Sequence, residues 1–163
     1  MLVVSDASPI NFLVRAGYIG LLERLFQRVL IPPAVADELT RETTPESVRQ
    51  FMCSPPPWLE IRSPAVVAFI PRLHAGETAA ISLALEVRAS LVLIDEWAAR
   101  RAAVERGLAV VGLLGVLDRA AAAGWISLPE AIARVPADFR IDPAVIEALL
   151  ASDAARGSPP PIP

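Results

Sequence analysis

The chain has 163 residues, about one domain in length, and 54% of them are hydrophobic, which excludes disorder for most of the chain. All 15 basic residues are arginine, and 18 acidic residues give a formal net charge of −3, so any contact with nucleic acid has to be local. The lack of lysine excludes a P-loop and a pyridoxal Schiff base, and the single His74 and Cys53 exclude a zinc finger and an internal disulfide.

Short apolar runs rich in β-branched residues alternate along the chain with segments whose apolar residues have helical spacing. After the first run, Ser8 and Pro9 form a favoured pair for the N-cap and first position of a helix. The predicted strands are residues 2–5, 28–31, 58–62, 91–94 and 109–111, and the predicted helices are residues 8–16, 18–26, 34–41, 45–53, 77–88, 96–106 and 114–123. Because alternating strands and helices form βαβ units, we expect an α/β fold, a three-layer α/β/α domain with a central, mainly parallel sheet over residues 1–126.

Beyond residue 126 this alternation stops. Two amphipathic helices are predicted near residues 129–135 and 143–151, within a helical extension (127–156) that packs on the domain. Residues 157–163 hold four prolines and are predicted to be a flexible tail. The N-terminus lacks the features of a signal peptide, and the longest uncharged apolar run is too short to span a bilayer, so we expect a cytoplasmic protein without membrane contact.

Four acidic residues are predicted to lie at one edge of the sheet. Asp6 and Asp95 directly follow two strands, Glu38 lies in the helix after the second strand, and Glu77 lies in the first turn of a later helix. Taken singly, these acids are better explained by structural roles: Asp6 and Asp95 by capping the next helix, Glu77 by favourable contact with a helix dipole, and Glu38 by a solvated helix face. Together they would repel one another unless a cation neutralised them, and an all-carboxylate set suits Mg²⁺ or Mn²⁺ better than zinc.

Four segments around these acids, in this order, resemble the PIN-domain family: Val4–Leu13, Val29–Leu39, Leu73–Glu86, and Leu91–Glu96 with the following Arg100 and Arg101. The likeness is in particular to small prokaryotic proteins of the VapC-like kind, in a branch whose third motif begins Gly-Glu and which has a Gly-x-x-Gly-Val-Leu segment, here Gly112–Leu117. The resemblance covers residues 2–126.

This resemblance implies a metal-dependent ribonuclease that cleaves RNA phosphodiester bonds. Asp6, Glu38, Glu77 and Asp95 would be the catalytic residues and would hold one or two Mg²⁺ or Mn²⁺ ions. It also implies a homodimer and the toxin half of a toxin–antitoxin pair, inhibited by a small antitoxin protein.

Several further residues are candidates near these acids. Ser8 would support the first carboxylate or a metal-bound water, and Glu96 would compete with Asp95 as a ligand. Three arginines are candidates for contacts with phosphates of the substrate, although an exposed, solvated helix face explains them equally well: Arg41, Arg100 and Arg101. The three tryptophans show no interleaving with basic residues, so no base-stacking platform of the OB or RRM kind is expected.

Two other functions are compatible with the fold. A catalytically degenerate PIN fold would act as an RNA- or protein-binding module, and the four intact acids argue against it. A phosphatase of the haloacid-dehalogenase kind would also place acids at this edge, but it needs an Asp-x-Asp motif where this chain has Asp6 followed by Ser8, and it needs a lysine.

Overall fold

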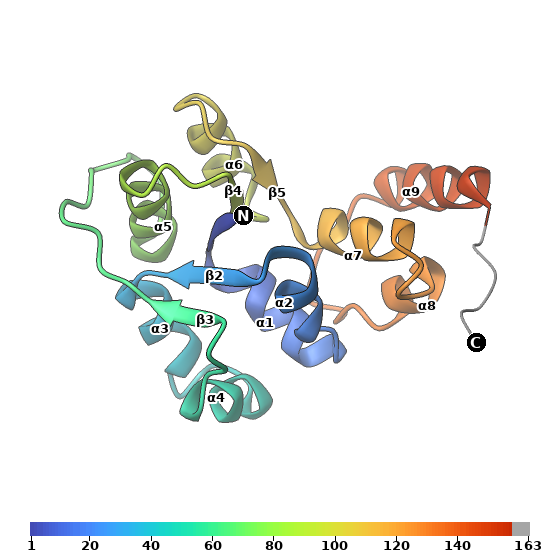
Figure 1. The fold of residues 1–163 in the computed structure, drawn as a ribbon, viewed down its shortest axis with the longest axis horizontal. Coiled ribbons are helices and arrows are strands. Elements are labelled where there is room, and N and C mark those ends of the chain that lie inside the picture. Colours follow the sequence, from blue (N-terminus) through green and yellow to red (C-terminus); the bar gives the residue numbers. More distant parts are fainter. Residues whose placement is uncertain (158–163) are drawn as a thin grey trace.

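The computed structural model describes residues 1–157 and contains a five-stranded sheet in which every pair of neighbouring strands is parallel (Figure 1). Its order is β3-β2-β1-β4-β5. The strands are β1 (Leu2–Ser5), β2 (Arg28–Ile31), β3 (Leu59–Ile61), β4 (Leu91–Leu93) and β5 (Val110–Val111). The α/β class is therefore confirmed, with an entirely parallel sheet. Of the predicted tail, only Gly157 lies within the described residues.

Helices connect all the strands and continue beyond the last one. They are α1 (Ala7–Ala16), α2 (Gly20–Phe26), α3 (Pro33–Thr40), α4 (Glu46–Cys53), α5 (Ala75–Glu86), α6 (Trp97–Val104), α7 (Leu113–Ala122), α8 (Leu128–Ala133) and α9 (Pro143–Arg156). The predicted start of the first helix was wrong, because Asp6 occupies the N-cap and Ser8 is the second helical residue. Pro9 is tolerated at the third position because the N–H groups of a first turn have no partner within the helix.

The sheet is apolar on both faces. Val3 and Val29 point into a core formed with α1, α2 and α7, while Val4 and Leu30 point into a second core formed with α5 and α6. Successive strand residues face opposite sides of a sheet, so two buried faces require nearly continuous apolar strands, as the sequence has here. These two cores separate the three layers that the sequence predicts.

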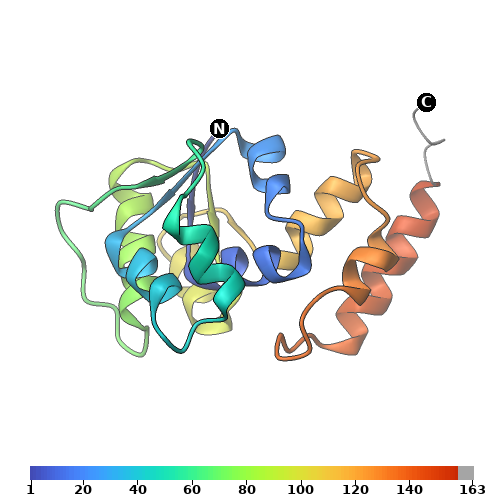
Figure 2. The same ribbon diagram turned by 90° about the horizontal axis from the view of Figure 1, so that it is seen from below.

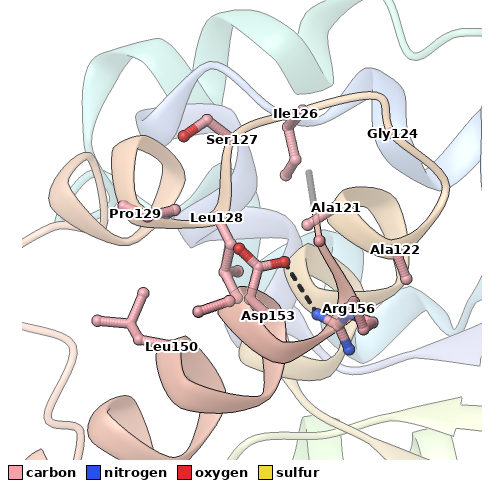
Figure 3. Close-up of a pocket in the computed structure, with 12 residues that line it drawn as sticks. Ala121, Ala122, Gly124, Ile126, Ser127, Leu128, Pro129, Leu150, Asp153 and Arg156 are labelled. Atoms are coloured by element: carbon pink, nitrogen blue, oxygen red, sulfur yellow. Dashed lines mark hydrogen bonds and ion pairs between the residues drawn. The ribbon is translucent and has the colours of Figure 1, made fainter. Parts of the chain in front are cut away.

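Helices α7, α8 and α9 lie together at one end of the molecule (Figures 1 and 2). The end of α9 is fixed by Arg156, whose Nη2 is 2.6 Å from Asp118 Oδ1 on α7 and 3.1 Å from Asp153 Oδ1. A cavity of about 990 Å³ lies between these helices (Figure 3). None of the four predicted acids lines it, so its size does not make it the candidate site. None of the helices in residues 1–157 is both long and apolar enough to cross a membrane.

Candidate active site

The strand order places a topological switch point between β1 and β4. From β1 the chain winds outward through β2 and β3, and it then returns to the other side of β1 to form β4 and β5. The two central strands are joined at their carboxyl ends, where the Asp6 N–H donates to the Leu93 carbonyl at 2.9 Å. Ligands of open α/β sheets bind in the crevice at such a point. Asp6 and Asp95 follow these two strands, so both lie at the expected place.

Asp6 is a buried carboxylate with an oxygen that lacks a partner. Its side chain is 4% exposed, and Oδ1 accepts no hydrogen bond from the described residues. Burial raises the pKa of Asp6 to about 7, against the opposing effect of the Ala7 N–H, and the negative charges of Glu38, Glu77 and Asp95 raise it further. All three other predicted acids are therefore near enough to disfavour ionisation of Asp6.

Gly76, in the first turn of α5, leaves space for two of these carboxylates. A Cβ at this position would lie 2.9 Å from Oε2 of Glu38 and 3.4 Å from Oδ1 of Asp6. Glu38 reaches this point from α3, where it is half-buried. The two carboxylates thus share one small space beside the start of α5, and a larger residue than glycine would displace them.

Glu77 has a structural role as well as a place in the cluster. It is the third residue of α5, is 6% exposed, and its Oε2 accepts the His74 N–H at 2.8 Å, which satisfies a donor at the helix start. Burial is the largest cause of its raised pKa, which the His74 hydrogen bond and charge oppose and the charges of Glu96 and Glu38 support. Glu77 therefore caps the start of α5, and its role as a metal ligand stays a prediction.

Asp95 is fixed by a hydrogen bond to a distant helix. Its Oδ1 accepts the N–H of Leu113, the first residue of α7, at 2.7 Å, whereas Oδ2 is buried and has no partner within residues 1–157. Burial raises the pKa of Asp95 to about 6, although the Leu113 N–H and the nearby Arg100 lower it. Arg100 is held beside Asp95 because its Nη1 donates to the Ile94 carbonyl at 2.8 Å. One oxygen of Asp95 is thus anchored and the other is free to bind a ligand.

Gly112→Ala is expected to disrupt this arrangement. The new Cβ would lie 2.5 Å from Asp95 Oδ1 and 2.9 Å from Arg100 Nη1, so the carboxylate has to rotate away from the Leu113 N–H. Loss of that hydrogen bond should lower the free energy of unfolding by about 1–3 kcal/mol. Thermal unfolding measures the loss, and Gly20→Ala is the control because nothing lies within 4 Å of its Cβ position. Equal melting temperatures for the two variants would contradict the placement of Asp95.

The predicted supporting residues lie in different surroundings. Ser8 is half-buried and lines a cavity of about 250 Å³ together with Glu38, and it makes no hydrogen bond to Asp6 within the described chain. Glu96 is the exposed N-cap residue of α6, and its charge acts on Glu77. Both residues therefore border the cluster of four acids without a direct contact to Asp6.

The three candidate arginines have different surroundings in the structure. Arg100 lines a cavity of about 640 Å³ with Asp95. Its neighbour Arg101 instead pairs with Glu105 at 2.8 Å and lies over the ring of Trp97. Arg41 is the exposed C-cap residue of α3 and forms no ion pair with Glu38 in the described part of the chain. The structure brings Arg100 alone among them next to a predicted acid.

The carboxylates fit a hard divalent cation by their chemistry. They offer only oxygen ligands, which Mg²⁺ and Mn²⁺ prefer, and the partnerless oxygens of Asp6 and Asp95 are buried where a cation would stabilise them. Among residues 1–157, however, no three acidic, histidine or cysteine side chains are already close enough to form a metal site. The acids thus surround the switch point, and their side chains have to move closer to share one ion.

Some residues beside the acids were not predicted. Thr43 and Thr44, just after α3, line the cavity of Glu38 and Ser8, and Arg140 lines the cavity of Asp95. Thr44 also donates its hydroxyl to the Glu38 carbonyl at 2.7 Å. A cluster of polar residues after a helix is a weak signal for the two threonines. No local pattern could have placed Arg140, because it reaches the site from the C-terminal extension.

Comparison with known proteins identifies the family of this chain. A family model described as a PIN domain, DUF3368, matches residues 2–154. This match includes α8 and most of α9, so it extends beyond residue 126, where the resemblance seen in the sequence ends. Neither a curated protein nor a solved structure matches the chain. The fold, the acids at its switch point and the family match agree, and the chain belongs to the PIN-domain family, whose members are typically metal-dependent nucleases.

Proposed function

We propose that this chain is a Mg²⁺- or Mn²⁺-dependent endoribonuclease that hydrolyses RNA phosphodiester bonds and acts as the toxin of a toxin–antitoxin pair. The observation that carries the proposal is the pair of buried, partnerless carboxylate oxygens on Asp6 and Asp95 at the switch point. An ionised carboxylate buried without a partner is costly, so its presence favours a site that a cation completes.

Each acid has a defined part in this proposal. Asp6 and Asp95 would bind the metal through their partnerless oxygens, Glu38 through the end of its side chain, and Glu77 through the oxygen that does not accept the His74 N–H. A bound divalent ion lowers the pKa of a water molecule and offsets charge on the scissile phosphate. Arg100, held beside Asp95, supplies a guanidinium for a phosphate oxygen of the substrate.

The direct test uses a fluorescently labelled single-stranded RNA with the wild-type protein in EDTA, Mg²⁺ or Mn²⁺. Cleavage is expected only with the metals, and calorimetry should detect Mn²⁺ binding in the absence of RNA. Cleavage that persists in EDTA would contradict the mechanism. Failure to bind Mn²⁺ would instead favour the alternative of a degenerate PIN fold that acts as a binding module.

The proposal includes a homodimer and a small antitoxin as protein partners. The loop between β3 and α5 supports it, because this loop exposes the neighbouring apolar residues Val66, Val67 and Phe69, and protein contacts commonly bury such residues. Light scattering tests the dimer against the chain mass of 17.4 kDa. Co-purification with the product of an adjacent reading frame, together with loss of RNA cleavage in that complex, tests the antitoxin.

A further inference from the structure

Two cavities at the carboxyl edge of the sheet share a wall that the C-terminal extension provides. The cavity of about 640 Å³ is lined by Asp95, Trp97 and Arg100 and, from residues between α8 and α9, by Arg140. The cavity of about 250 Å³ that contains Glu38 is lined by Asp138 of the same loop. Residues 134–142, which connect α8 to α9 and are here called the connecting loop, therefore border the cavity lined by Asp95 and the cavity lined by Glu38.

The connecting loop is fixed to α1, the helix whose N-cap is Asp6. Arg15 of α1 donates to both carboxylate oxygens of Asp138, at 2.8 and 2.7 Å. Next to this pair, Phe139 packs edge-on against Phe12 of α1 with ring centroids 4.5 Å apart. A bidentate arginine pair and an aromatic contact define the position of the loop more firmly than a single surface ion pair would. These contacts therefore give the connecting loop a defined position beside both cavities.

The side chains of the larger cavity suit a single-stranded nucleic acid. Arg140 is exposed and forms no ion pair or side-chain hydrogen bond within residues 1–157, so its guanidinium is free for a phosphate. Trp97 is 69% exposed at the start of α6, and the ring face that Arg101 does not cover offers a surface on which an unpaired base can stack. Asp142 is an acidic residue of the connecting loop that also lines this cavity. Its side chain caps α9 by accepting the Ala144 N–H at 2.9 Å, and it forms no ion pair with Arg140 within residues 1–157.

We propose that the connecting loop forms the outer wall of a groove for single-stranded RNA, in which Arg140 binds a backbone phosphate away from the cleaved bond and Trp97 stacks on a base. The proposal rests on the proposed ribonuclease function and assigns the C-terminal extension to substrate binding. Arg140 is a positioning residue, because it would hold the RNA strand at a phosphate away from the cleaved bond and take no part in the cleavage step.

The test compares Arg140→Gln with Arg119→Gln, which removes the same charge from an exposed residue of α7 that lines none of the described cavities. Binding of a labelled single-stranded RNA is measured by fluorescence anisotropy in EDTA over a range of salt concentrations. Arg140→Gln should weaken binding about 10-fold, the effect of losing one charged hydrogen bond. It should also reduce the slope of log K against log salt by about 0.7. Arg119→Gln should change neither quantity.

Cleavage with Mn²⁺ separates this proposal from the proposed function. For Arg140→Gln we expect KM to rise about 10-fold while kcat changes less than twofold, because the contact is lost equally in the bound substrate and the transition state. If the wild type cleaves RNA and both variants have the same affinity and KM as the wild type, the proposed groove is contradicted and the proposed ribonuclease function is unaffected. If the wild type only binds RNA and Arg140→Gln alone weakens binding, the groove is supported and the ribonuclease fails. A wild type that neither binds nor cleaves RNA overturns both.

Discussion

Asp6→Asn is expected to lower Mn²⁺-dependent RNA cleavage at least about 100-fold and, at the same time, to raise the melting temperature of the metal-free protein. The loss of cleavage follows from removing a buried carboxylate at the switch point, and 100-fold corresponds to about 2.7 kcal/mol of transition-state stabilisation. In a host in which the wild type arrests growth, the variant should also lose that effect.

The gain in stability has a separate physical cause. Above pH 7 the folded, metal-free protein has to ionise Asp6, although burial and three neighbouring acids raise its pKa from 3.8 to about 7. Asparagine has nearly the same shape and carries no charge, so this unfavourable ionisation disappears. A pKa displacement of this kind is worth about 1.4 kcal/mol per unit, so we expect an increase of roughly 5–10 °C at pH 8.

Opposite effects on activity and stability distinguish a metal ligand from a structural aspartate, which would stabilise the fold. Asp37→Asn is the matched control, because Asp37 is an exposed acid on α3, next to Glu38 in the sequence. It should leave both the melting temperature and the cleavage rate unchanged. Asp6→Asn protein that still cleaves RNA, or that melts at a lower temperature than the wild type in EDTA, would contradict the assignment of Asp6.

The fold was predictable because its determinants are local in the sequence. The strands next to Asp6 and Asp95 are continuous apolar runs, which is typical of strands buried on both faces, and helices of suitable length separate them. The start of α1 was less predictable. Both Asp6 and Ser8 are good N-cap residues by type, and only the end of β1 at Ser5 determines that the helix begins at Ala7.

The positions of the four acids could be predicted for the same reason, since Asp6 and Asp95 follow strands, Glu77 lies in the first turn of a helix, and Glu38 lies in the helix after β2. The side chains that surround these acids could not be predicted from the sequence. Arg100 and Arg101 are adjacent on α6 and look alike in the sequence, yet one reaches the Ile94 carbonyl beside Asp95 and the other pairs with Glu105. Successive helical residues point about 100° apart, so the orientation of α6 on the sheet decides which of the two lies at the site.

The connecting loop was beyond prediction because its position depends on contacts between distant residues. Arg15 and Asp138 are 123 positions apart, and neither lies in a motif. The extension was predicted as two helices packed on the domain, without any part near the acids. Its contribution to the candidate site comes from tertiary packing of Phe139 on Phe12, for which no periodicity or turn signal exists.

The stability of the metal-free protein is expected to fall as the pH rises from 5 to 8, and Mn²⁺ should reverse most of that fall. Both Asp6 and Asp95 have folded pKa values, about 7 and about 6, that lie above the ordinary value of 3.8. Well below pH 3.8 both carboxyls are protonated in the folded and unfolded chains, and folding carries no penalty from their ionisation. Between pH 5 and 8 the unfolded carboxyls are already ionised while the folded ones still have to lose their protons, so the folded state loses about 4 kcal/mol of relative stability over this range.

Thermal unfolding in EDTA and in excess Mn²⁺ at several pH values tests this linkage. In EDTA the melting temperature should decline by roughly 8–16 °C between pH 5 and 8. The stabilisation by Mn²⁺ should be larger at pH 8 than at pH 5, because protons compete with the metal for the same oxygens. The double variant Asp6→Asn, Asp95→Asn should remove both the decline and the effect of Mn²⁺. If the melting temperature of the wild type in EDTA rises over this pH range, the burial of ionisable carboxyls at the switch point is contradicted. If Mn²⁺ stabilises the wild type and the double variant equally, the metal binds elsewhere.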